Sequence, residues 1–387
     1  MSFTTAQLIA DENTATFLWS SKISVRQNRH GKQLLHNYTI YTDQSGVERS
    51  RWLKREFVPN PIDKSRWMKR SFGVVVPPQD NYQDTVVWPK DPAHPERPAL
   101  IPLCYVDSRS QSILEPLVLQ GIKDWHNKLG PNRGVGFVVL SYKICDEQVH
   151  DRNNGQVIRN PGLTHDTVHI QYDDPGSISA TIGYYRRTCA PGRHRLFFNP
   201  NQAQPQEVAR DAHWAMTHEL GHVLGLLHEH QRPDAGQHIT LVCSAIAGYS
   251  ALDEWLHKNN WKVDFDDDDL DFVRSADEIC QDHEMALEFA TNSVPGAPPF
   301  NPLELMPQVP QDIDITLRYH YYRPYDLSSI MHYGSEQRGE RSLLTTGKQK
   351  TLLLKDGSDI PWDGTSTPSD GDRETVNMMY PPIVQAQ

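Results

Sequence analysis

The feature that most constrains this chain is the segment EVARDAHWAMTHELGHVLGLLH at residues 207–228. At about 100° per residue, its apolar side chains gather on one side of a helix. His218 and His222 then lie about 40° apart on the opposite side. The apolar side consists of Ala212, Met216, Leu220, Val223, Leu224 and Leu227. We therefore expect a helix that packs one face against a core and presents two imidazoles from the other.

The residues around these histidines form a pattern with a defined chemistry. Glu219 completes the motif His-Glu-x-x-His, in which two imidazoles bind Zn²⁺ and the glutamate lies close enough to activate water. The pattern continues through Gly225 to His228. A glycine can adopt the left-handed backbone that ends a helix and turns the chain back, so a third imidazole can reach the same metal. Three histidines without cysteine leave coordination positions open for water, as catalytic zinc sites require.

Two segments resemble a known family. HELGHVLGLLHEHQRPD at 218–234 resembles the extended zinc motif of the astacin family of metzincin metallopeptidases, and YDLSSIMHYG at 325–334 resembles that family's Met-turn. The resemblance implies that Met331 lies beneath the metal and that Tyr333 is an additional zinc ligand. It also implies that Glu229 pairs with the N-terminus formed when a precursor is processed. Tyr333 after Met331, and Glu229 after His228, favour astacin over another metzincin branch.

Fainter similarity to the family extends outward from these motifs. Trp88-Pro89 and IPLCYVD at 101–107 look like the start of an astacin catalytic domain, and SDGDRETVNMMYP at 369–381 is similar to its closing helix. We therefore expect a catalytic domain at 86–387. Because the chain between the two motifs is longer than in the family, we also expect an insertion around 240–320, bordering the cleft.

The apolar periodicity predicts an α+β fold for this domain. One helix is expected at 111–129, and strands at 100–106, 135–144, 167–172 and 178–185. A helix followed by several strands and a second helix is typical of α+β domains. By resemblance, the fold is that of metzincin zinc proteases: a mixed sheet and an active-site helix over a mostly irregular C-terminal subdomain.

These residues predict a zinc-dependent endopeptidase with one Zn²⁺ per chain and protein or peptide substrates. The metal would lower the pKa of bound water and polarise the scissile carbonyl. Glu219 would act as the general base and pass the proton to the leaving amine. By resemblance, Tyr333 would leave the metal and donate to the developing oxyanion. The alternative is a non-catalytic zinc- or peptide-binding module on the same fold, which Glu219 and Tyr333 disfavour.

Residues 1–85 allow two interpretations: a propeptide that keeps the enzyme latent, as in the family, or a permanent N-terminal extension. SRWLKR at 50–55 recurs as SRWMKR at 65–70. The dibasic ends of both copies suit processing sites in a flexible segment, or exposed basic turns. The resemblance implies secretion, although residues 1–20 lack the apolar stretch of an export signal.

Charge and hydropathy argue against two classes of partner, nucleic acids and a spanned membrane. With 38 basic and 49 acidic residues the net charge is −11, which argues against a general nucleic-acid binder. No apolar run approaches the ~20 residues of a membrane-spanning helix.

The five cysteines are not at recognisable family positions, so they allow up to two disulfides or buried free thiols. The oligomeric state is left open.

Overall fold

The computed structural model divides into two compact units, Met1–Arg70 with Asp264–Leu270, and Ser71–Val263 with Asp271–Gln387. The residues that the structure describes are 3–7, 19–27, 33–42, 48–57, 87–148, 157–160, 163–172, 178–184, 192–200, 208–232, 234–259, 262–263, 271–273, 275–282, 285–286, 289–290, 296–306, 324–340, 347–361 and 366–384. Each unit is considered by itself below.

The first unit contains a four-stranded antiparallel sheet that the polar sequence did not predict. Its strands are neighbours in chain order: β1 (Phe3–Gln7), β2 (Trp19–Gln27), β3 (Gln33–Thr42) and β4 (Glu48–Phe57). Lys54 and Arg55 lie within β4, opposite Asn37 and His36 of β3. The expectation of a flexible segment or a turn at this dibasic pair is therefore wrong. The second dibasic pair lies outside the described residues.

The second unit is α+β, as expected, and its main sheet has five strands in the order β10-β11-β9-β5-β6. All neighbouring pairs are parallel except β10 with β11. The strands are β5 (Ala99–Tyr105), β6 (Val135–Ile144), β9 (Val168–Tyr172), β10 (Ser179–Ala180) and β11 (Arg195–Phe198). Three expected strands are confirmed within one residue, whereas the one expected at 178–185 is only two residues long. The sequence did not predict β11.

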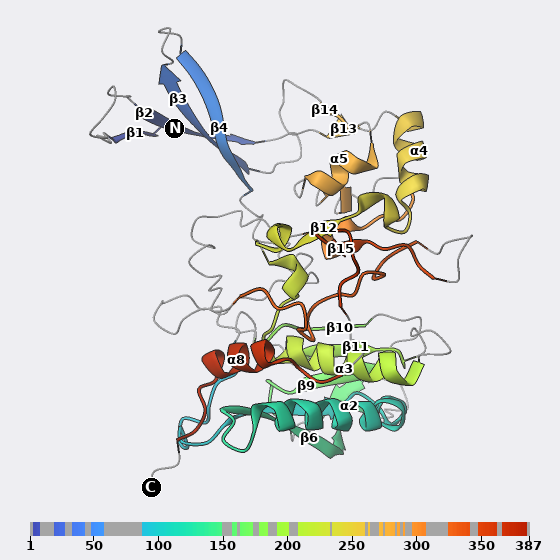
Figure 1. Ribbon diagram of the computed structural model, residues 1–387. Helices are drawn as coiled ribbons and strands as arrows, with labels where there is room; N and C mark the ends of the chain where they lie inside the picture. Colours follow the sequence, from blue (N-terminus) through green and yellow to red (C-terminus); the bar gives the residue numbers. More distant parts are fainter. Residues whose placement is uncertain are drawn as a thin grey trace. The chain divides into compact units, whose positions relative to one another are not determined.

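Two long helices pack against this sheet and against each other (Figure 1). Helix α2 (Ser108–Leu129) begins at Asp107, whose carboxylate accepts a hydrogen bond from the Ser110 N–H and so caps the first turn. Helix α3 (Val208–Leu224) carries the histidine pair. Five of the six apolar side chains predicted for its packed face are buried, namely Ala212, Met216, Leu220, Val223 and Leu224. The helix and its core face are therefore confirmed.

The two helices come close at Gly121 of α2. A Cβ added there would meet a methyl carbon of Leu220 at 2.9 Å and the Thr217 hydroxyl at 3.2 Å, so a larger residue would force α3 side chains to shift. The Trp125 indole N–H donates to the Thr217 carbonyl at 2.9 Å, in the middle of α3. The histidine-bearing helix is thereby fixed along its length.

The C-terminal end of α3 is capped by residues from both ends of the second unit. The Trp88 indole N–H donates to the Val223 carbonyl at 2.7 Å, and the Tyr380 hydroxyl donates to the Leu224 carbonyl at 2.9 Å. Tyr380 follows helix α8 (Asp370–Met379) and also accepts from the Trp88 N–H. Because helix ends leave carbonyls without intrahelical partners, these bonds stabilise α3 where it approaches the site.

The remainder of the second unit is mostly short or irregular, as expected. Its described elements are β7 (Asp146–Gln148), β8 (Val157–Arg159), β12 (Ile239–Leu241), α4 (Tyr249–Asn259), β13 (Lys262–Val263), β14 (Asp271–Phe272), α5 (Ala276–Gln281), β15 (Leu352–Leu354) and the 3₁₀ turns η2 (Glu229–Gln231), η3 (Ala235–Gln237), η4 (Cys243–Ala245) and η5 (Pro302–Glu304). Disulfides join Cys104 to Cys145 and Cys243 to Cys280. The fifth cysteine, Cys189, lies outside the described residues.

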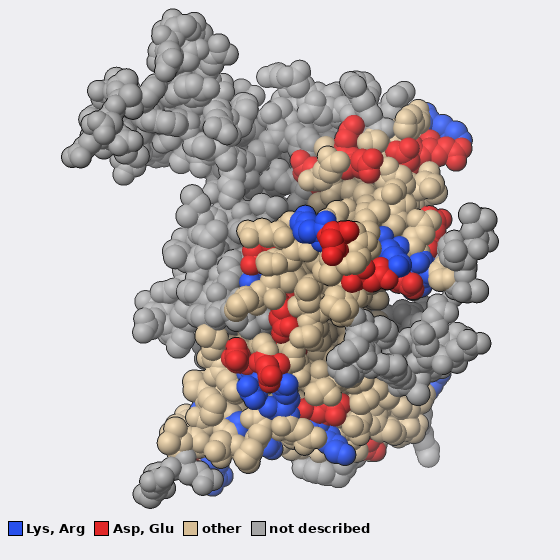
Figure 2. All heavy atoms as spheres, in the orientation of Figure 1, with Lys and Arg blue, Asp and Glu red and all other residues tan. Residues whose placement is uncertain are grey.

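The surface of the described residues carries charges of both signs. On the face drawn in Figure 2, basic and acidic side chains are interspersed. Within the described part of the chain, no helix is both long and apolar enough to cross a bilayer.

Candidate metal centre

Three imidazoles converge where α3 ends. His218 and His222 lie on α3, and His228 follows after the helix has ended. Gly225 makes this turn with a φ of +110°, and its N–H donates to the His222 carbonyl at 2.9 Å. A residue with a Cβ rarely adopts this backbone, as the sequence indicated. The His228 Nε2 lies 3.1 Å from the Nε2 atoms of both other histidines.

The hydrogen bonds at the opposite ring nitrogens fix how each imidazole is protonated. The Nδ1 atoms of the three rings lie 2.8–2.9 Å from oxygens that can only accept: Ile330 O for His218, Leu226 O for His222 and Gln231 Oε1 for His228. Each Nδ1 therefore carries the proton, and each Nε2 presents a lone pair. Burial lowers the pKa of His222 to about 4 and holds those of His218 and His228 well below 6.5, so the rings are neutral near pH 7.

This arrangement fits a metal cation. Three convergent lone pairs repel each other unless a cation lies between them. Nitrogens that bind zinc tetrahedrally at about 2.05 Å are roughly 3.3 Å apart, close to the 3.1 Å found here. The three side chains form a group whose ligand atoms all lie within 4.8 Å of one another. His218, His222 and His228 are thus suited to hold one Zn²⁺.

Glu219 lies next to this group and is itself buried. Its Oε2 has no hydrogen-bond partner among the described residues. Burial alone raises the pKa of Glu219 to about 8, and a cation held by the three histidines would lower this pKa and favour the carboxylate. A buried carboxyl oxygen without a protein partner beside open metal positions is suited to bind a water molecule or a substrate proton.

Met331 packs against α3. A Cβ added to Gly221 would meet the Met331 sulfur at 2.5 Å, so the thioether packs directly against the helix backbone between His218 and His222. Met331 is fully buried. The residue before it, Ile330, accepts the His218 Nδ1–H. The segment therefore supports the ligands both by packing and by a hydrogen bond.

Tyr333 lies beside the histidines. Its ring centroid is 4.6 Å from that of His228 and 5.9 Å from that of His218. Burial, and then the nearby carboxylates of Glu304 and Glu219, raise the pKa of its hydroxyl, which keeps it protonated near neutral pH. The structure thus brings Tyr333 and Glu219 together around the three histidines.

Two histidines that the sequence analysis did not single out hold Tyr333 in place. His230 stacks on its ring at 4.3 Å, and His230 Nδ1 accepts from the Tyr333 N–H at 3.4 Å. His332 Nδ1 donates to the Tyr333 carbonyl at 2.7 Å, and its Nε2 accepts from the Tyr325 hydroxyl. Both histidines lie within the quoted motifs, but their partners depend on how the two motifs meet in space.

Glu229 is buried and pairs within its own domain. Its Oε1 accepts from Arg232 Nη1 at 2.9 Å and from the Asp326 N–H at 2.8 Å. Arg232 also binds Asp234 with its other nitrogens, at 2.8–2.9 Å. Glu229 therefore connects the loop after His228 to the beginning of the Met331 segment.

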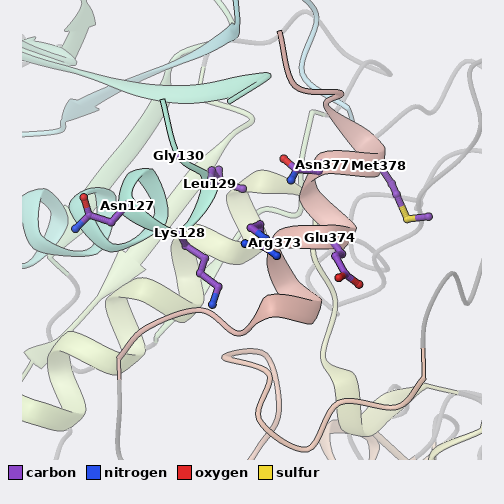
Figure 3. Close-up of a pocket in the computed structure, with 8 residues that line it drawn as sticks. All are labelled: Asn127, Lys128, Leu129, Gly130, Arg373, Glu374, Asn377 and Met378. Carbon is purple, nitrogen blue, oxygen red and sulfur yellow. The ribbon is translucent and has the colours of Figure 1, made fainter. Parts of the chain in front are cut away.

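A cavity of about 730 Å³ lies away from this group, between the C-terminal end of α2 and helix α8 (Figure 3). It is lined by Asn127, Lys128, Leu129, Gly130, Arg373, Glu374, Asn377 and Met378. Its lining includes none of the predicted metal or catalytic residues.

Comparisons with known proteins gave a family match and a structural match. Residues 211–264 match the model of the astacin family of peptidases. Among solved structures, the chain is similar to high choriolytic enzyme 1, a hatching enzyme zinc-protease from the medaka fish Oryzias latipes, with 13% identity and a TM-score of 0.42 over 78% of this chain and 98% of that chain. No curated protein matched the sequence. The segment that matches the astacin peptidase family contains all three convergent histidines.

Proposed function

We propose that this chain is a zinc-dependent endopeptidase with one Zn²⁺ held by His218, His222 and His228. The observation that carries the proposal is the set of three neutral imidazoles with convergent lone pairs beside a buried carboxyl oxygen that has no protein partner among the described residues. The match of this segment to a peptidase family supports the same conclusion.

When bound, zinc supplies a Lewis acid that polarises a carbonyl and lowers the pKa of water toward neutrality. Glu219 is the general base: its carboxylate takes a proton from the attacking water and delivers it to the nitrogen of the leaving amine. The surroundings of Glu219 support this role, because its buried Oε2 has no hydrogen-bond partner among the described residues and is free to accept from water.

Tyr333 is proposed as an additional metal ligand. When substrate is bound, its hydroxyl would donate a hydrogen bond to the oxyanion that develops on the scissile carbonyl. This role stabilises charge that is present mainly in the transition state. Two observations support this role: the Tyr333 ring contacts His228, and the imidazoles of His230 and His332 form hydrogen bonds with the Tyr333 backbone. Met331, Gly225 and Glu229 are proposed as supporting residues that position the ligand loop.

Residues 1–85 are proposed to lie outside the catalytic domain, as a propeptide or a permanent extension.

We also propose that the protein is secreted. The two disulfides support this, because such bonds form and persist in oxidising compartments.

The proposal is tested by metal analysis together with peptide hydrolysis. Purified protein should contain one zinc per chain and cleave protein substrates. A chelator should abolish cleavage, and added zinc should restore it. Zinc binding without any hydrolysis would instead indicate a non-catalytic binding module, and activity that is indifferent to chelation would contradict the metal assignment.

A further inference from the structure

The third ligand is held differently from the first two. His218 and His222 donate from Nδ1 to main-chain carbonyls, whereas His228 donates to the side chain of Gln231 at 2.8 Å. Gln231 is buried and three residues after His228, in the 3₁₀ turn η2. The groups that accept from a metal-bound imidazole set its tautomer and ring orientation. At His228 the tautomer and ring orientation therefore depend on a side chain that a mutation can remove.

The other end of the Gln231 amide reaches the insertion. Its Nε2 donates to the Leu303 carbonyl at 2.9 Å, 72 residues further along the chain. The next carbonyl, of Glu304, accepts from His230 Nε2 at 2.9 Å. Both carbonyls belong to the turn η5, so one short piece of the insertion binds two consecutive residues of the ligand loop.

The Leu303 carbonyl determines which way the Gln231 amide faces. If the amide were reversed, its NH₂ group would meet the Nδ1–H of His228 and its oxygen would meet the Leu303 carbonyl. Both contacts would then be between like groups, donor against donor and acceptor against acceptor. With the observed orientation both bonds form. The insertion therefore selects the amide orientation that leaves the His228 Nε2 lone pair for the metal.

Residues 302–306 of the insertion are mostly buried and form a hydrogen-bonded turn. Leu305 is fully buried and Met306 nearly so. The N–H groups of both residues donate to the Pro302 carbonyl, at 2.8 and 3.0 Å, and so close the turn. Movement of this turn would break the bond to Gln231, because a side-chain amide has little freedom once it is bound at both ends.

We propose that Gln231 is a positioning residue that couples this turn to the third ligand, so that metal binding and ordering of residues 302–306 strengthen each other. The inference rests on the proposed metal site and assigns to Gln231 and the insertion a role in it. Because coupling between two sites is reciprocal, it has two consequences. Removing the Gln231 side chain lowers the affinity for the metal, and binding of the metal stabilises the turn.

The first consequence is tested by titrating metal-free protein with Zn²⁺ and Co²⁺. Gln231→Met has a similar volume but cannot make either hydrogen bond, so it should bind about 10–100-fold more weakly and change the Co²⁺ absorption spectrum. Gln231→Glu retains an acceptor for His228 but loses the donor to the Leu303 carbonyl, so it should restore the affinity only in part. Gln237→Met alters an exposed glutamine of the next turn and should bind as wild type. Thermal melting of the metal-free variants checks that all are folded.

The second consequence is tested by hydrogen exchange at the Leu305 and Met306 amides. Zinc should slow their exchange in wild type and in Gln237→Met, and this protection should be lost in Gln231→Met. Unchanged zinc affinity in Gln231→Met, or retained protection by zinc, would overturn the coupling while leaving the metal site intact. A wild-type protein that binds no zinc would overturn the proposed function as well.

Discussion

The Nδ1–H of His218 donates to the carbonyl oxygen of Ile330 at 2.8 Å, across 112 residues of sequence. The N–H of Ile330 in turn donates to Oδ2 of Asp372, a buried carboxylate of α8, at 2.9 Å. A single residue, Ile330, thus connects the first predicted ligand to the C-terminal helix. The position of His218 therefore depends on residues that are far from it in the chain.

Asp372→Ala should lower both stability and zinc affinity. The carboxylate accepts from the Ser329 hydroxyl and from the N–H groups of Ile330 and Ser369, so its loss leaves buried donors without a partner. We expect the free energy of unfolding to fall by about 2–4 kcal/mol in denaturant titrations. Asp370→Ala removes an exposed carboxylate of the same helix and is the matched control. Equal stability of the two variants would contradict a supporting role for Asp372.

Gly221→Ala should disturb the packing between α3 and Met331. The added Cβ would lie 2.5 Å from the Met331 sulfur and 3.2 Å from the Trp125 ring. We expect the free energy of unfolding to fall by about 1–3 kcal/mol and zinc binding to weaken. Gly236→Ala places a Cβ in open space and should change neither quantity. Normal stability and zinc binding in Gly221→Ala would show that Met331 does not pack as described.

Tyr333→Phe keeps the ring that contacts His228 and removes only the hydroxyl. If that hydroxyl donates to the oxyanion, kcat should fall by about 10²-fold or more with little change in KM. Steady-state kinetics on a short peptide measure both constants. A change confined to KM would contradict this role.

The role of residues 1–85 is tested by comparing the full chain with a version that begins near Asn81. A propeptide should inhibit, so the shorter protein should hydrolyse a small peptide faster. Equal or greater activity of the full-length protein would exclude inhibition and leave the alternative of a permanent extension.

The histidine group could be predicted from the sequence because its geometry is local. Four residues of helix and one glycine turn bring His218, His222 and His228 together, although distant residues such as Ile330 then help to hold the rings. Strands β5, β6 and β9 could be predicted for a similar reason, since β5 and β6 are largely apolar and β9 alternates apolar with polar residues. Strand β11 has only four residues, too few for a clear pattern, and the strands of the first unit are largely polar.

Other features of the site depend on contacts between distant segments. Nothing in the sequence near Gln231 indicates that its amide meets the Leu303 carbonyl, 72 residues further along the chain. Likewise, Trp88 and Tyr380 resembled the two ends of a family domain, but their common role in capping α3 appears only when the chain is folded. Sequence patterns predicted the ligands, while the structure was needed to find the residues that hold these side chains.

The central claim is that His218, His222 and His228 hold a zinc ion whose chemistry requires Glu219 as the base. Glu219→Gln tests it most directly, with zinc content and peptide hydrolysis measured on the same preparation. Because Glu219 is not a ligand, the variant should retain one zinc per chain while its turnover falls by at least about 10²–10⁴-fold. Near-normal turnover in the zinc-loaded variant would contradict the account.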